Sequence, residues 1–205
     1  MLFDTETVGF ESYKERNLYY KLFAGYLFNE LIEGWQSRFD SFVSLLAEPT
    51  YPETRPLAPL LLKAGTTHVS FDNHLIQLAD SATDRGEFAD VLLFDSDSRA
   101  LVAIEAKFLS DWDFEKDVKS NGDRLEEARR KLGASSVTSV LLVAETKWKS
   151  VVAQHRQKQS QYRLLVENHA KHPVRVLIWE RVQLACTAGV VRSYLEERLG
   201  DLAPR

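Results

Sequence analysis

Two apolar segments on either side of a short polar turn constrain the fold of this chain more than any other feature. Residues 88–94 and 100–108 are each long enough for a strand, and the second is apolar throughout Leu101-Val102-Ala103-Ile104. Polar residues dominate positions 95–99 between them, which predicts a β-hairpin. We expect the second strand to lie in the interior of a sheet.

The rest of the chain predicts a single mixed α/β domain over residues 1–205. Four of the six prolines lie in residues 48–60, which we interpret as a connection between elements. The expected elements, in chain order, are a helix over 13–35, a strand within 68–78, the hairpin strands 88–94 and 100–108, a helix from about 110 to 132, a strand over 137–144, a helix over 146–167, a strand over 174–179 and a closing helix over 190–199.

Several classes of protein are excluded by composition. Cys186 is the single cysteine, so neither an internal disulfide nor a cysteine-based zinc site is possible. No run approaches the roughly 20 apolar residues of a membrane-spanning helix, and the N-terminus lacks the pattern of a signal peptide. We therefore expect a soluble cytoplasmic protein with no membrane partner.

The hairpin brings two carboxylates together. If Asp95 lies opposite Ala100, then Asp90 lies opposite Glu105, with Cβ atoms about 5 Å apart. Strand alternation places Lys107 on the same face as Glu105. Two such carboxylates repel each other unless a cation lies between them, and Mg²⁺ or Mn²⁺ suits oxygen ligands. A metal-bound water beside a lysine is a plausible centre for hydrolysing a phosphodiester.

Asp90, followed after fourteen residues by Glu105-Ala106-Lys107 across a hairpin, resembles the PD-(D/E)XK nucleases of the restriction-endonuclease-like superfamily. The resemblance implies an α/β fold with a restriction-endonuclease-like mixed sheet flanked by helices, and metal-dependent phosphodiester hydrolysis. Asp90 and Glu105 would bind the metal, with the carbonyl of Ala106 completing the site, and Lys107 would assist the attacking water. The chain departs from the family at Ala89, where a proline is frequent.

Nucleases of this superfamily often add an acid from the first helix. Glu15 and Glu30 are the two candidates here, and we favour Glu15 as a catalytic residue because it precedes the apolar repeat. An acid near a helix N-terminus is also favourable on dipole grounds alone, which leaves a purely structural role for Glu15 open.

The acid-x-Lys pattern occurs twice more, so the hairpin motif has rivals. Asp117-Val118-Lys119 falls in an expected helix, where residues two apart do not share a face. Glu145-Thr146-Lys147 follows an apolar strand and is the stronger rival, although no hairpin partner precedes it. The hairpin carboxylates themselves could instead be an ordinary exposed salt-bridged face.

Charge along the chain points to a nucleic-acid partner. Residues 1–100 hold 8 basic and 16 acidic side chains, and residues 101–205 hold 18 basic and 14 acidic ones, within a net charge of −4. The cations that could follow a nucleic-acid backbone from the expected 146–167 helix are Lys149, Arg156, Lys158 and Arg163. A merely solvated helix face is the alternative. We expect this helix to border the pocket of Asp90 and Glu105.

The sequence thus predicts a metal-dependent nuclease, with DNA favoured over RNA as substrate. Cutting both strands of a duplex would call for a homodimer. The alternative is a non-catalytic member of the same fold, acting as a nucleic-acid-binding or protein-interaction subunit. Strand specificity, sequence specificity and the choice between endonuclease and exonuclease stay open.

Overall fold

The computed structural model describes residues 23–31, 33–47, 61–71, 89–107, 125–149, 174–185 and 196. Several expectations lie outside these residues. They are the roles of Glu15, Arg156, Lys158 and Arg163, the proline-rich connection 48–60, the start of the 110–132 helix, and most of the helices 146–167 and 190–199.

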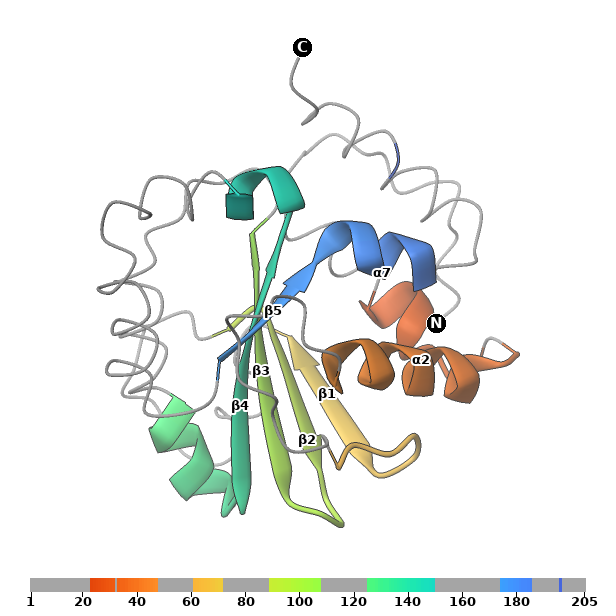
Figure 1. Cartoon of the computed structure of the whole chain (residues 1–205). Helices are drawn as coiled ribbons and strands as arrows, with labels where there is room; N and C mark the ends of the chain where they lie inside the picture. The colour runs from red at the N-terminus through yellow and green to blue at the C-terminus, as the bar shows by residue number, and fades with distance from the viewer. Residues whose placement is uncertain are drawn as a thin grey trace, which may run out of the picture.

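A five-stranded mixed sheet forms the centre of the fold (Figure 1). Its strands lie in the order of the chain, with β1 pairing β2 and β2 pairing β3 antiparallel, and with β3 pairing β4 and β4 pairing β5 parallel. The strands are β1 (Thr67–Phe71), β2 (Val91–Asp95), β3 (Ala100–Lys107), β4 (Ser136–Val143) and β5 (Val174–Ile178). The predicted mixed α/β class is therefore confirmed.

The predicted hairpin and its register are also confirmed. Val91 pairs with Ile104 and Phe94 with Leu101, so continuing the register places Asp90 opposite Glu105. The strands differ slightly in length from the prediction, because β2 begins only at Val91. Turn residues occupy 96–98.

The hairpin turn is held by a buried carboxylate, that of Asp95, which is 0% exposed. Its Oδ2 accepts hydrogen bonds from Thr66 Oγ1 (2.6 Å), Thr67 Oγ1 (3.1 Å) and the Lys63 amide (3.1 Å). Its Oδ1 accepts from the amides of Asp97 (3.1 Å) and Ser98 (2.8 Å) and from Ser98 Oγ (2.9 Å). Asp95 thus ties the turn to the segment that leads into β1.

Strand β3 is apolar throughout its first half because both of its faces are covered. Residues 100–104 are buried, and exposure increases only at Glu105 and Lys107 near its end. Its even-numbered residues pack in the larger core, and Leu101 and Ala103 pack in the second core on the opposite face. The charged residues of β3 therefore lie near its end, on the face where its burial becomes incomplete.

The larger core lies between the sheet and three helical elements, η1 (Phe23–Leu27), α2 (Trp35–Ala47) and α7 (Trp179–Ala185), which Figure 1 shows together on one side of the sheet. Aromatic rings fill this core. The rings of Phe23 and Phe42 lie edge-on with their centroids 5.3 Å apart, and those of Phe28 and Phe39 lie edge-on with their centroids 5.5 Å apart. Such ring pairs add to the free energy gained by burying their apolar surface.

Two boundaries differ from the sequence prediction on this face. A single helix over 13–35 is wrong within the described residues, because η1 ends at Leu27 and non-helical residues follow before α2 begins. Gly34 has a φ of 74°, a left-handed conformation that glycine adopts without steric cost and that reorients the chain. Trp179 was expected to end the last strand but instead begins α7, where its side chain is 1% exposed.

The opposite face of the sheet is covered by helical residues 125–132, and residues 145–149 begin a second helical segment there. Leu125 and Ala128 pack against Leu92 and Leu101. Trp148, which was expected to point inward, is 4% exposed and lies with residues of β4 and β5. No helix in the described part of the chain is long and apolar enough to cross a membrane.

Candidate active site

Asp90 lies at a bend directly before β2, and its side chain turns toward β3. Its Oδ2 accepts a hydrogen bond of 2.7 Å from the backbone amide of Ala106. The preceding residue, Ala89, has a φ of 38°. A proline is restricted to φ near −65° and could not adopt that conformation. The absence of a proline at position 89 therefore agrees with the backbone conformation there.

Glu105 and Lys107 lie on the same face of β3, as strand alternation predicts. Lys107 Nζ is 2.7 Å from Glu105 Oε1, and the side chains of Lys107 and Glu105 are 21% and 18% exposed. The intervening Ala106 and the preceding Ile104 are buried in the larger core on the other face. Both charged groups are thus partly withdrawn from water, and their ion pair is screened less than a fully exposed one.

The backbone of Ala106 also points toward Asp90. In a strand, the amide and the carbonyl of one residue are directed to the same neighbouring strand. Because the Ala106 amide donates to Asp90, the Ala106 carbonyl is directed to the same side of β3. The structure therefore places the Asp90 carboxylate at the backbone of Ala106, the residue between Glu105 and Lys107, whose side chains form an ion pair.

This donor set suits a hard divalent cation. Two carboxylates and one ammonium leave a net charge of −1, and all of the candidate ligand atoms are oxygens. A carboxylate that ligates a metal is commonly hydrogen-bonded to a second group, as Asp90 is to the Ala106 amide. Among the described residues, no group of three or more His, Cys, Asp and Glu side chains is placed to hold a metal.

Glu145-Thr146-Lys147, the rival motif, lies in a different context. These residues are in a short helical segment directly after β4, where residues two apart do not share a face. Glu145 Oε1 is 3.0 Å from Lys149 Nζ, an i,i+4 ion pair. Glu145 and Lys147 therefore do not reproduce the strand geometry of Glu105 and Lys107. The other rival, Asp117-Val118-Lys119, lies outside the described residues.

Glu180 lies just after β5, at the same end of the sheet, and the sequence analysis did not single it out. Both of its carboxylate oxygens accept the amide hydrogen of Glu145, at 3.2 and 3.1 Å. Burial raises the pKa of Glu180 above its ordinary value, although the hydrogen bond from Glu145 opposes the shift. The available sequence signal was an acid directly after the apolar segment 174–179.

The candidate first-helix acids are separated from this site or lie outside the described residues. Glu15 belongs to the second case. Glu30 is exposed in the turn before α2 and lines a cavity beside Thr67 and Val69, on the α2 side of the sheet. Because Thr67 pairs with Asp95, this part of β1 lies toward the end of the hairpin opposite to Asp90. Glu30 is thus not brought together with Asp90 and Glu105.

The helix that is expected to bind nucleic acid begins directly after β4, at the end of the sheet where Lys107 lies. Lys107 is in register with Val143, and the helical residues 145–149 follow directly. Trp148 packs with Leu141 and Val143, on the face of the sheet that carries Glu105 and Lys107. Of the four expected phosphate-binding cations, Lys149 is described; its side chain is 65% exposed and pairs with Glu145.

Comparison of the chain with protein-family models, with curated proteins and with solved structures found no match.

Proposed function

We propose that this chain is a metal-dependent nuclease of the PD-(D/E)XK type, acting on nucleic acid, with DNA as the favoured substrate. The observation that carries the proposal is the 2.7 Å hydrogen bond from the Ala106 amide to Asp90. It joins the two separated parts of the motif, because the same Ala106 stands between Glu105 and Lys107. The resemblance in the sequence is thereby supported by a spatial one.

The order of elements supports the same proposal at a coarser level. An antiparallel three-stranded meander, β1–β2–β3, is followed by helical residues 125–132 and a parallel strand, β4. The restriction-endonuclease-like core has a helix, a three-stranded meander, a helix and a further strand. Asp90 and Glu105 lie at the open end of the hairpin, and the side chains of Glu105 and Lys107 keep 18% and 21% of their surface exposed, through which a substrate would reach them.

The chemistry of each residue follows from its position. A bound Mg²⁺ or Mn²⁺ would supply a water of lowered pKa and charge stabilisation for the phosphate oxygens. Asp90 and Glu105 would hold the ion, with the Ala106 carbonyl as a further ligand. Lys107 would donate hydrogen bonds to the water or to the phosphate, and its ammonium charge would stabilise the negative charge of the transition state.

The ion pair between Lys107 and Glu105 supports this division of roles. It holds the flexible lysine side chain on the face that carries the carboxylates. When Glu105 ligates a cation, the ammonium group of Lys107 stays within reach of a ligand at the same centre. Lys149, in the helical segment that follows β4, would contact the phosphate backbone of the substrate from the same end of the sheet.

The experiment compares cleavage by the wild type with that by conservative variants. Supercoiled plasmid, linear duplex, single-stranded DNA and RNA are incubated with Mg²⁺ or Mn²⁺, using Asp90→Asn, Glu105→Gln and Lys107→Met. We expect each variant to lose at least about a hundredfold in rate. Binding of Mn²⁺, followed by its paramagnetic resonance signal, should weaken in the two acid variants and not in Lys107→Met.

A second ion pair of the same residue types provides the matched control. Lys131 Nζ is 3.0 Å from Glu127 Oε1 in the helical segment 125–132. Glu127→Gln and Lys131→Met should therefore cleave at the wild-type rate. Equal cleavage by all five variants would indicate a contaminating nuclease and refute the site. Nucleic-acid binding without cleavage or Mn²⁺ binding would favour the non-catalytic module instead.

A further inference from the structure

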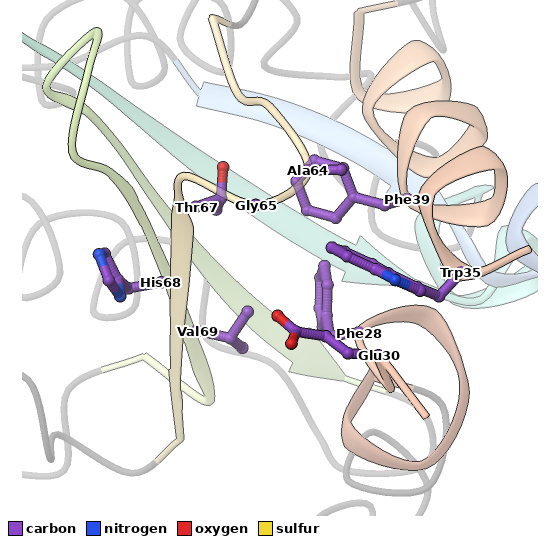
Figure 2. A pocket seen from close by; sticks show the side chains of 9 residues that line it. All are labelled: Phe28, Glu30, Trp35, Phe39, Ala64, Gly65, Thr67, His68 and Val69. Carbon is purple, nitrogen blue, oxygen red and sulfur yellow. The ribbon is translucent and has the colours of Figure 1, made fainter. Parts of the chain in front are cut away.

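A cavity of about 310 Å³ opens between β1 and the turn that precedes α2 (Figure 2). It contains no residue of the candidate active site. Val69, on its β1 side, packs against the larger core, whereas Glu105 and Lys107 lie on the opposite face of the sheet. The volume is within the range of small-molecule sites, near its lower limit.

Aromatic rings form the helical side of this cavity. Phe28, Trp35 and Phe39 line it, and Figure 2 shows the side chain of Trp35 extending from α2 toward β1. Phe39 is 1% exposed and lies edge-on to Phe28 with ring centroids 5.5 Å apart. The core therefore holds the aromatic wall in place before any ligand binds.

The cavity has acidic character. Glu30 lines it, and its carboxylate points toward Val69 in Figure 2. The imidazole of His68 points away from the rings, and the lining residues include neither Lys nor Arg. The guanidinium of Arg38, on α2, lies over the ring of Tyr26 at 4.6 Å and donates to the Glu33 carbonyl. Among the described lining residues, Glu30 is thus the acidic one.

We propose that this cavity binds an alkylammonium group. The faces of aromatic rings carry negative charge density and attract cations, with tryptophan the most effective. A carboxylate beside the rings adds a full negative charge and favours a cation over a neutral molecule of the same shape. Trp35, Phe28 and Glu30 supply these two attractions within one small cavity. The site is independent of the nuclease proposal.

The test compares choline with 3,3-dimethyl-1-butanol, a neutral molecule of nearly the same shape. Both are titrated into the ¹⁵N-labelled full chain, and the indole signal of Trp35 is assigned by its loss in Trp35→Phe. We expect saturable shifts with choline and binding of the neutral molecule that is weaker by about tenfold or more. N-acetyl-lysine methylamide, titrated separately, distinguishes a lysine side chain from a free small cation as the natural source.

Two variants identify the residues responsible. Glu30→Gln removes the charge and should weaken choline binding by about three- to tenfold. Glu33→Gln removes an exposed charge from the same turn, outside the cavity, and should leave binding unchanged. Trp35→Leu should abolish the preference for choline, and circular dichroism would verify that it still folds.

Other outcomes would overturn the proposal. These are the absence of saturable choline binding, equal affinity for choline and its neutral analogue, or equal effects of Glu30→Gln and Glu33→Gln. If adenosine bound more tightly than choline and depended on Trp35, the cavity would instead be a stacking site for a base.

Discussion

The carboxylate of Asp90 accepts the amide hydrogen of Ala106 at the end of the β2–β3 hairpin, where a backbone carbonyl would stand in a longer ladder. Continuing the register would pair Ala106 with Ala89. The φ of 38° at Ala89 turns the backbone out of the ladder, and the side chain of Asp90 supplies the acceptor instead. One acid thus both terminates the pairing of β2 with β3 and stands at the candidate metal centre.

The two roles of Asp90 are separable by substitution. Asp90→Asn retains an oxygen that can accept from the Ala106 amide, so we expect its free energy of unfolding to stay within about 0.5 kcal/mol of the wild type. Asp90→Ala removes the acceptor and should cost about 1–2 kcal/mol. Urea unfolding measures both. Cleavage and Mn²⁺ binding should be lost in both variants; an active Asp90→Asn would show that the carboxylate acts only in folding.

Removing Asp95 should destabilise the chain in a pH-dependent way. Burial opposes its ionisation, but the hydrogen bonds from Thr66, Ser98 and Lys63 outweigh burial and hold the pKa of Asp95 well below its ordinary value. The folded state therefore binds a proton less readily than the unfolded state. This contribution to stability is complete above the unfolded pKa of about 4 and is lost as the pH falls toward the folded pKa.

Asp95→Asn should cost about 2–4 kcal/mol at pH 7, because the amide cannot accept from all of these donors. Its stability should also fall less than that of the wild type between about pH 4 and pH 2. Asp97→Asn, an exposed acid in the same turn, is the control, and urea unfolding at several pH values is the measurement. If the free energies of unfolding of the wild type and Asp95→Asn changed with pH in the same way, the lowered pKa of Asp95 would be refuted.

Arg99 and Gly133 form a coupled pair at the end of the helical segment 125–132. Arg99 Nε donates to the Gly133 carbonyl at 2.7 Å, and its Nη2 donates to the Leu132 carbonyl. Gly133 has a φ of 60°, and a Cβ there would lie 2.6 Å from Arg99 Nη2. Gly133→Ala should cost about 1–2 kcal/mol from left-handed strain and from this contact.

A double-mutant cycle separates the two causes. In an Arg99→Met background the steric contact is absent, so Gly133→Ala should cost less than it does in the wild type. Thermal unfolding of the wild type, the two single variants and the double variant gives the coupling free energy between positions 99 and 133. Additive effects would mean that backbone strain accounts for the whole cost.

The ionised form of Glu180 should be a net cost to stability at neutral pH. Burial raises the pKa of Glu180, so the folded state binds a proton more readily than the unfolded state over the interval between the ordinary and the raised pKa. Stability therefore decreases as the pH rises through that interval. The stability of Glu180→Gln relative to the wild type should accordingly become more favourable between pH 4 and pH 7. Urea unfolding of the two proteins at several pH values is the measurement, and a difference in stability that does not change with pH would contradict the prediction.

The parts of the fold that depend on local alternation were predictable. β4 and β5 were expected at 137–144 and 174–179 and are found at Ser136–Val143 and Val174–Ile178. The helix over 13–35 was wrong at its end, because its apolar spacing continued across a turn in which the Asn29 side chain accepts from the Leu31 amide. α2 was not among the expected elements, although Phe39, Phe42 and Leu46 carry the three- and four-residue spacing of a helix.

The sequence by itself determined the register of the hairpin, with Val91 opposite Ile104, and the common face of Glu105 and Lys107. The short polar turn at 95–99 fixes this register, because it places Asp95 opposite Ala100. The tertiary structure alone decided that Ala106 holds Asp90, that Glu180 approaches Glu145, and that Glu30 lines a separate aromatic cavity. These relationships join residues far apart in the chain or depend on a single left-handed backbone angle, and neither leaves a periodic pattern in the sequence.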